Sequence, residues 1–295
     1  MEAVEEVIDR DRGNLLQRLG KFVRFSHTLF ALPFALVSML VAGQGFPPMR
    51  IIVGILICMV AARTSAMAFN RIVDWDYDKG NPRTADRHKL VTKQTATIVV
   101  WLSSAVFVVG AWYLNVLCLA LAPVAVALIF FYSVTKRFTH FSHFFLGLSL
   151  SAAPMGAWAA VNGELWSLAP YILAFGVLLW VFGFDLIYST MDEKYDRSAG
   201  LYSFPSRYGV QATLKLSRVL HALAILTFAW FGFEAGLSWG FWAALLVCAG
   251  GLIWEHKLSK SGDIGLINKA FFEVNAIVSL AFLVGVSLDI FFLLN

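Results

Sequence analysis

Charged residues are scarce in this chain of 295 residues. Only 14% of the residues are Asp, Glu, Lys or Arg, and 59% are hydrophobic, whereas soluble domains carry about 25% charged residues. Stretches such as 53–69, 116–132 and 274–288 contain almost no charge. A helix needs roughly 20 mostly apolar residues to cross the ~30 Å hydrocarbon core of a membrane. A soluble fold could not bury so many of these stretches, so the sequence predicts an integral protein of the lipid bilayer.

Cysteine is also scarce, and its placement excludes two kinds of site. Cys58, Cys118 and Cys248 all lie inside apolar stretches, where cysteine usually behaves as a small core residue. We therefore expect neither a disulfide nor a zinc centre. The first 23 residues lack the apolar stretch of a cleavable signal peptide. We interpret residues 1–24 as a cytoplasmic N-terminal segment and residues 25–295 as one membrane domain.

The apolar stretches predict an all-α polytopic fold, because strand alternation is absent and in lipid only helices and closed barrels satisfy the backbone. We expect nine transmembrane helices. Their approximate ranges are 25–44, 51–70, 95–113, 115–134, 142–161, 167–188, 212–233, 237–254 and 270–292.

Lys and Arg are distributed unevenly between the two sides of these spans. Nineteen of the 23 lie in the N-terminal segment or in the loops after spans two, four, six and eight, while the opposite loops carry only Arg50. Positive loops stay in the cytoplasm, so we expect the N-terminus and the long loops 71–94 and 189–211 there. This topology accounts for the net charge of +4, and we expect no nucleic-acid partner.

Acidic side chains gather at the end of the second span. Asn70, Asp74 and Asp78 follow one another at four-residue spacing, and Arg63 lies seven residues before Asn70. On one continuous helix these four residues would share a face. Like charges at this spacing destabilise a helix, so the crowding indicates a bound cation rather than a solvated surface.

A second acidic stripe follows the sixth span. Asp185, Tyr188, Asp192 and Asp196 are spaced by three, four and four residues, which again selects one helical face. Asp185 comes directly after an apolar stretch that ends at Phe184. It therefore lies at the membrane end of its span, where an ionisable group is costly and usually functional.

Two carboxylate stripes on separate helices are typical of a Mg²⁺ site, because this ion prefers oxygen ligands and bridges to substrate phosphates. The alternative is a set of structural ion pairs with the Lys and Arg of the same loops. We predict these metal ligands: Asn70, Asp74, Asp78, Asp185, Asp192 and Asp196.

The two stripes resemble the motifs of the UbiA superfamily of intramembrane prenyltransferases. Residues 70–78 resemble the first aspartate-rich motif of the family, and the following Asn-Pro-Arg-Thr at 81–84 resembles its continuation. Residues 185–196 resemble the second motif. Further likeness lies at 132–139 and 203–209, so the resemblance extends over most of the chain.

The resemblance implies nine helices around a central cavity, with Mg²⁺ as cofactor and a polyprenyl diphosphate as donor. It implies transfer of the polyprenyl group to an aromatic acid like 4-hydroxybenzoate, in quinone (ubiquinone) biosynthesis at a bacterial inner membrane. The predicted catalytic residues are Asp74, Asp78, Asp192, Asp196 and Arg63. The predicted substrate-binding residues are Arg63, Arg83, Tyr132, Lys136, Arg137, Tyr188 and Arg207.

Two alternatives remain open at this point. The segment 25–34, which contains His27 and Pro33, resembles a branch that includes the futalosine-route enzymes of menaquinone biosynthesis and implies a dihydroxynaphthoate acceptor. The alternative from another class is a cation-coupled membrane transporter, which typically has acids near mid-span in both halves. In this chain the acids cluster at span ends.

Overall fold

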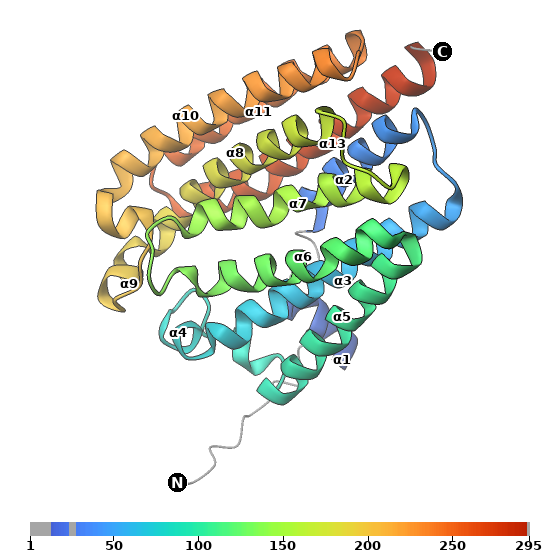
Figure 1. Cartoon of the computed structure of the whole chain (residues 1–295). Helices are drawn as coiled ribbons and strands as arrows, with labels where there is room; N and C mark the ends of the chain where they lie inside the picture. The colour runs from blue at the N-terminus through green and yellow to red at the C-terminus, as the bar shows by residue number, and fades with distance from the viewer. Residues whose placement is uncertain (1–12, 24–27, 294–295) are drawn as a thin grey trace.

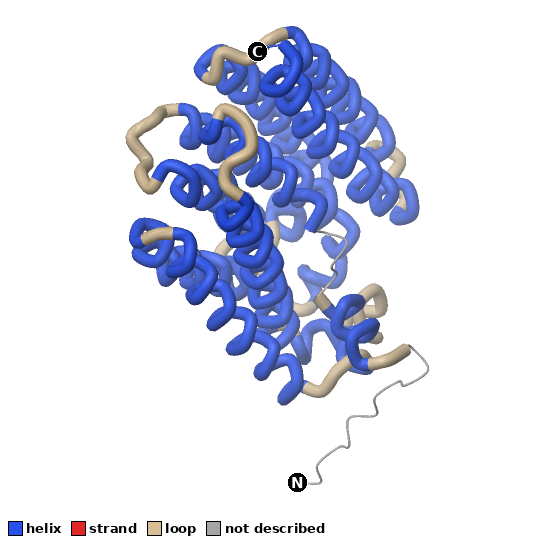
Figure 2. The backbone as a smooth tube through the Cα atoms, turned by 90° about the vertical axis from the view of Figure 1, so that its right-hand side faces the viewer, coloured by secondary structure: helices blue, strands red, loops and turns tan. Residues whose placement is uncertain are grey.

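Long apolar helices make up most of the chain in the computed structural model, which describes residues 13–23 and 28–293 (Figure 1). The long helices are α2 (Thr28–Gly43), α3 (Met49–Val73), α5 (Lys93–Leu114), α6 (Val116–Thr135), α7 (Ser142–Asn162), α8 (Ala169–Ser189), α10 (Phe204–Glu234), α11 (Trp239–Ser259) and α13 (Asn275–Leu288). The short elements are α1 (Leu15–Phe22), α4 (Trp75–Gly80), α9 (Glu193–Ser198), α12 (Ile264–Lys269), the 3₁₀ turns η3 (Arg87–Lys89) and η4 (Thr190–Asp192), and the π-helical turns η5 (Ala270–Val274) and η6 (Asp289–Leu293). Figure 2 shows that these described residues form helices and loops without any strand, which confirms the all-α class.

Seven helical segments of the described chain are long and apolar enough to cross a membrane. Each of the seven coincides with an expected span. The apolar part of α2, Phe30–Gly43, is shorter, and the expected first span begins in residues 24–27, outside the described part. Helix α11 carries Glu255, His256 and Lys257 near its end and is not one of the seven. The polytopic prediction is confirmed, but the count of nine spans is not exact.

The long helices pack in a closed series. Helix α3 packs against α5 and α6, and the series continues through α7, α8, α10, α11 and α13. Helix α2 completes it by contacting both α13 and α7 (Figure 1). Helix α8 is buried along nearly its whole length, and its single charged residue is Asp185. An ionisable group in so enclosed a helix needs a partner or a function.

A small apolar core joins α1 to the end of α3. Phe22 and Val23 pack with Met67 and Trp75 in this cluster. Part of the N-terminal segment, which the sequence marks only as polar, is therefore a helix that covers the end of α3. Asn14 caps this helix by accepting from the Gln17 backbone N–H at 2.9 Å.

Both acidic segments leave the bundle at the same end. Helix α4 follows α3 and helix α9 follows α8, and both short helices lie at the left in Figure 1. They also touch, because the Tyr195 hydroxyl of α9 donates to the backbone carbonyl of Tyr77 in α4 at 2.6 Å. We call this end of the bundle the motif end.

Candidate active site

A cavity of about 220 Å³ opens at the motif end and is lined by both acidic segments. Its walls come from α2, α3, α4, the loop after α4, the end of α6, α7, α8, η4, α9, the loop after α9 and η5. Its polar lining includes Arg63, Asn70, Asp74, Asp78, Asn81, Arg83, Tyr132, Lys136, His143, Asp185, Tyr188, Asp192 and Asp196. The two stripes therefore meet at one cavity.

The first motif extends over two helices instead of one. Helix α3 ends at Val73, and Asp74 is both its C-cap and the N-cap of α4, with φ −91° and ψ 12°. The side-chain amide of Asn70 still donates to Asp74 Oδ2 at 3.2 Å. Asp78 donates its backbone N–H to the Asp74 carbonyl at 2.7 Å. The expected stripe is thus kept across a helix break.

The second motif breaks at the corresponding residue. Helix α8 ends at Ser189, the turn η4 ends at Asp192, and α9 begins at Glu193. Asp192 has φ −101° and ψ 2°, close to the backbone conformation of Asp74. The spacing predicts one continuous helix for each motif, and this prediction is wrong. In both motifs the helix is broken at the middle aspartate.

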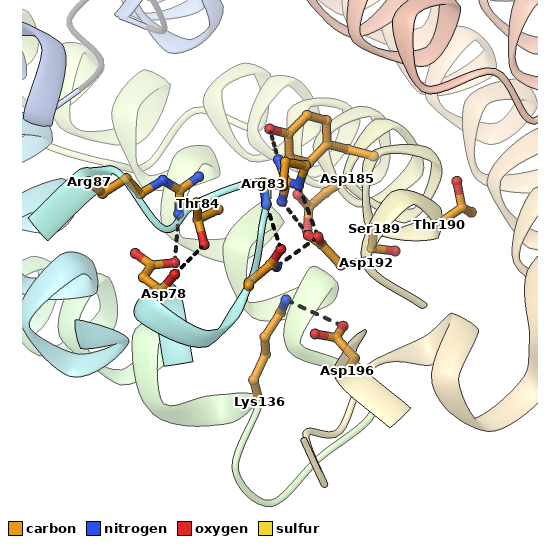
Figure 3. A network of polar contacts seen from close by, with 12 residues as sticks. Asp78, Arg83, Thr84, Arg87, Lys136, Asp185, Ser189, Thr190, Asp192 and Asp196 are labelled. Atoms are coloured by element: carbon orange, nitrogen blue, oxygen red, sulfur yellow. Dashed lines mark hydrogen bonds and ion pairs between the residues drawn. The ribbon is translucent and has the colours of Figure 1, made fainter. Parts of the chain in front are cut away.

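The loop after α4 joins the two motifs through Asp192 (Figure 3). Arg83 makes a bidentate contact with Asp192, in which Nε donates to Oδ1 at 2.9 Å and Nη2 donates to Oδ2. Asn81 donates to the same Oδ1 at 3.1 Å, and Arg83 also donates to the Tyr188 hydroxyl at 2.7 Å. Burial would lower the pKa of Arg83, but its hydrogen bond to Asp192 raises that pKa above its usual value. Both carboxylate oxygens of Asp192 are thus satisfied.

Asp78 and Asp196 each have basic partners as well, but neither makes a bidentate contact. Arg87 donates to Asp78 Oδ1 at 2.9 Å, and Lys136 Nζ lies 3.7 Å from Asp196 Oδ2 (Figure 3). Burial tends to lower the pKa of Lys136, but the attraction of Asp196 and the neighbouring carboxylates outweighs it and raises that pKa. Burial also raises the pKa of Asp74, against the opposing effect of Lys136.

Two carboxylate oxygens remain available for a cation. Asp78 Oδ2 and Asp196 Oδ2 are buried and accept no hydrogen bond from the described residues. Each has its nearest cationic atom at 3.7 Å, from Arg71 and Lys136 respectively. No three acidic, His or Cys side chains within the described part converge tightly enough to enclose an ion. One free oxygen from each motif fits Mg²⁺, which typically takes one or two carboxylates and completes its shell with phosphate and water.

Arg63 and Tyr132 line the inner part of the same cavity. Arg63 precedes Asn70 by seven residues on α3, and two helical turns correspond to roughly 10 Å. Arg63 is therefore attached to α3 deeper in the bundle than the carboxylate residues. Met67, Leu146 and Phe184 supply apolar walls, so this inner part combines the Arg63 side chain with apolar surface.

Two predicted substrate-binding residues lie elsewhere. Arg137 donates to the Val73 carbonyl at 2.6 Å and to Asp74 Oδ1 at 3.4 Å, so it holds the end of α3 from outside the cavity lining. Arg207 is exposed near the start of α10, just before a kink at Gly209, whose φ is 80°. Charge and family likeness selected both residues, but the backbone directs neither of them to the cavity wall.

His143 is a cavity residue that the sequence analysis did not select. It is 1% exposed at the start of α7, and its Nδ1 lies 2.6 Å from Asp185 Oδ2. Its Nε2 is buried without a hydrogen-bond partner in the described structure. A single histidine is not part of a recognisable sequence motif. Only the packing of α7 on α8 brings His143 and Asp185 together.

Comparison with known proteins gives one consistent result. The model of the UbiA prenyltransferase family matches residues 31–283. The 4-hydroxybenzoate octaprenyltransferase of Vibrio atlanticus (strain LGP32) is 29% identical over 262 residues, which cover 88% of this chain and 91% of that protein. The apo structure of a UbiA homolog from Aeropyrum pernix K1 is 32% identical with a TM-score of 0.81, over 89% of this chain and 98% of that chain. A UbiA homolog from Archaeoglobus fulgidus bound to DMAPP and Mg²⁺ shares the fold, with a TM-score of 0.66 and 15% identity over 89% of this chain and 99% of that one.

Proposed function

The chain belongs to the UbiA prenyltransferase family, and from this premise we propose that it transfers a polyprenyl group from polyprenyl diphosphate to an aromatic acid, with Mg²⁺ as cofactor. Family membership makes it an integral membrane enzyme and decides against the transporter alternative. Our first choice of acceptor is 4-hydroxybenzoate, the acceptor in the name of the Vibrio relative. A bacterial inner membrane is the proposed location, with the motif end in the cytoplasm.

The pair of free carboxylate oxygens supports this proposal most directly. Asp78 and Asp196 come from different motifs, line one cavity, and each keeps a buried oxygen without a donor. A purely structural ion-pair network would be expected to satisfy such oxygens, because a buried acceptor without a donor is unfavourable. A divalent cation satisfies them and neutralises part of the acidic cluster.

We assign the metal to five of the predicted ligands and leave Asp185, which is engaged by His143, to the inner cavity. The five are Asn70, Asp74, Asp78, Asp192 and Asp196. Bound Mg²⁺ supplies positive charge that stabilises the departing diphosphate. Arg83, Arg87 and Lys136 border the same cavity, and their side chains can turn from the aspartates to phosphate oxygens, which guanidinium groups bind well.

The reaction then follows from the polarity of the cavity. The bond between the allylic carbon and the diphosphate oxygen breaks, and its electron pair leaves with the diphosphate. A ring carbon of the acceptor supplies the pair for the new carbon–carbon bond, and the ring then loses one proton to a base, either a motif aspartate or the released diphosphate. The apolar walls at Met67, Leu146 and Phe184 exclude water, which would otherwise trap the allylic cation.

Arg63 is our candidate for the acceptor carboxylate. It is the basic side chain of the inner cavity, and a planar guanidinium binds a carboxylate through two parallel hydrogen bonds. This placement would orient the ring with its far edge toward the motif end, where the allylic carbon forms. Orientation of this kind turns an encounter into a reactive geometry.

Product analysis tests the proposal. Purified protein with Mg²⁺ is given several prenyl diphosphates together with 4-hydroxybenzoate, a dihydroxynaphthoate or phenol, and the products are identified by mass. We expect prenylated 4-hydroxybenzoate and little prenylated phenol. A product from the naphthoate alone would replace the acceptor and support the menaquinone alternative. Residues 25–27 of the segment that suggests this alternative lie outside the described residues. Release of no diphosphate with any acceptor would contradict the proposal.

A further inference from the structure

The His143–Asp185 pair is held by unusually close packing of α7 on α8. Its two polar atoms lie 2.6 Å apart, and Gly147 follows His143 by one helical turn. A Cβ at Gly147 would lie 2.7 Å from the backbone carbonyl oxygen of Leu178 in α8. The absence of a side chain at this position allows the two backbones to approach, and this approach brings the imidazole to the carboxylate.

The contact fixes which imidazole nitrogen carries the hydrogen. An ionised carboxylate only accepts hydrogen bonds, so Nδ1–H of His143 donates to Asp185 Oδ2. In the neutral ring the other nitrogen, Nε2, is then an acceptor. That atom is buried and has no donor among the described residues, which is unfavourable unless a ligand supplies one.

The surroundings of the pair indicate what kind of donor is missing. His143 and Asp185 line the cavity together with Leu146, Leu150 and Phe184. Asp185 lies within α8, whereas Asp192 ends the turn η4 that follows α8 at the motif end, so the pair lies inward of the proposed metal ligands. A ligand that matches this position is mainly apolar and carries a hydroxyl that can donate to Nε2.

We propose that Nε2 of His143, oriented by Asp185, accepts a hydrogen bond from the ring hydroxyl of the aromatic acceptor. This inference rests on the proposed function, because it names the side chain that recognises the hydroxyl of the proposed acceptor. His143 is then a specificity-determining residue that selects hydroxylated rings, and Asp185 is its positioning residue. A hydrogen-bonded hydroxyl also donates more electron density to the ring, which favours attack by the ortho carbon.

Two substitutions separate this role from a purely structural tie between α7 and α8. In His143→Asn the amide nitrogen takes the place of Nδ1 and keeps the donation to Asp185, but nothing replaces Nε2. In His143→Gln the longer side chain brings its amide oxygen close to the Nε2 position, while the short tie to Asp185 is lost. A structural role predicts that Asn is tolerated and Gln is harmful, whereas acceptor recognition predicts the reverse.

The measurement is the affinity of 4-hydroxybenzoate relative to benzoate, which lacks the hydroxyl. Binding is measured on protein loaded with Mg²⁺ and geranyl thiodiphosphate, an analogue that does not react. We expect the native protein to prefer 4-hydroxybenzoate by about tenfold or more, the worth of one buried hydrogen bond. The preference should fall toward unity in His143→Asn and survive in part in His143→Gln. Both variants should keep their affinity for the thiodiphosphate, which shows that they are folded.

Failure of this inference differs from failure of the proposed function. If the native protein prenylates 4-hydroxybenzoate and His143→Asn keeps the full preference, His143 does not read the hydroxyl and the inference is overturned. The same holds if the native protein prenylates both acids without any preference. If it prenylates no aromatic acid at all, the proposed function itself falls and takes this inference with it. If the native protein instead prenylates the naphthoate, the same binding comparison is made between a hydroxylated and an unhydroxylated naphthoate.

Discussion

At the scale of single residues, the motif aspartates differ in how fully their oxygens are occupied. Arg83 and Asn81 together satisfy both oxygens of Asp192. Asp78 and Asp196 each retain one buried oxygen without a donor. A cation gains most where the protein itself supplies the fewest donors, so the loss of negative charge at Asp78 or Asp196 should weaken metal binding most strongly.

The first prediction concerns these two carboxylates. Asp78→Asn and Asp196→Asn remove a negative charge at nearly constant volume. We expect each to reduce turnover at millimolar Mg²⁺ on the order of 100-fold or more, because electrostatic stabilisation of the leaving group is lost. The control is Asp86→Asn, an exposed acid paired with Lys89. Titration with Mg²⁺ should show a raised metal requirement in the two variants alone. Equal activity of all three would refute the metal assignment.

The second prediction concerns Arg63. Arg63→Lys keeps the positive charge but loses the planar fork that grips a carboxylate. We expect kcat/KM for the acceptor to fall about tenfold or more, which corresponds to ~1.4 kcal/mol of transition-state binding. The KM for the prenyl diphosphate should change little, because Arg63 lies inward of the carboxylates. The matched control is Arg50→Lys, because Arg50 is exposed and lies in the first turn of α3. Unchanged acceptor kinetics would reassign Arg63 to structural pairing.

At the scale of elements, the site depends on how closely α7 and α8 approach. At Gly147 the backbone of α7 faces the carbonyl of Leu178 directly, without a side chain between them. Gly156, two and a half turns later on the same helix, has open space where a Cβ would lie. The two glycines therefore offer a comparison between packing and helix propensity in a single element.

The third prediction uses this comparison. Gly147→Ala forces a methyl group against backbone that cannot rotate away, so we expect a destabilisation of about 1–3 kcal/mol. Gly156→Ala should be neutral or slightly stabilising, because Ala is the better helix former by ~1 kcal/mol. Thermal midpoints of both variants in one detergent give the measurement. A Gly147→Ala protein as stable as Gly156→Ala would show that the close approach is not needed.

The same elements show what the sequence could and could not predict. The length of the apolar stretches predicts the helices, because helix formation follows a local sequence pattern. The spacing of the acids likewise predicts the two motifs, which line one cavity. The helix breaks at Asp74 and Asp192 depend on contacts with the rest of the bundle, and the spacing alone favoured unbroken helices. His143 was missed for the same reason, since its partner Asp185 is 42 residues away. Arg207 is predicted from its charge and from family likeness, and neither of these determines the direction of its side chain.

At the scale of the whole molecule, positive charge is distributed unequally between the two ends of the bundle, and this difference predicts the orientation of the protein in the membrane. The motif end holds α4 and α9 with their Lys and Arg, while the loop between α7 and α8 at the opposite end contains only one charged residue, Glu164. Positive loops tend to remain in the cytoplasm, so this charge difference predicts that the proposed diphosphate site faces the side where soluble metabolites and Mg²⁺ are available.

The fourth prediction tests this orientation in the membrane. The three native cysteines are buried, so replacing them with Ala gives a background for single reporters. Lys79→Cys reports on the motif end and Glu164→Cys on the opposite end, and both positions are exposed. In intact bacterial cells with a permeabilised outer membrane, an impermeant maleimide should label Glu164→Cys readily. It should label Lys79→Cys only after the inner membrane is opened, because nineteen positive charges against one fix the orientation. The reverse pattern would place the acidic motifs outside the cytoplasm and leave the diphosphate without access to its site.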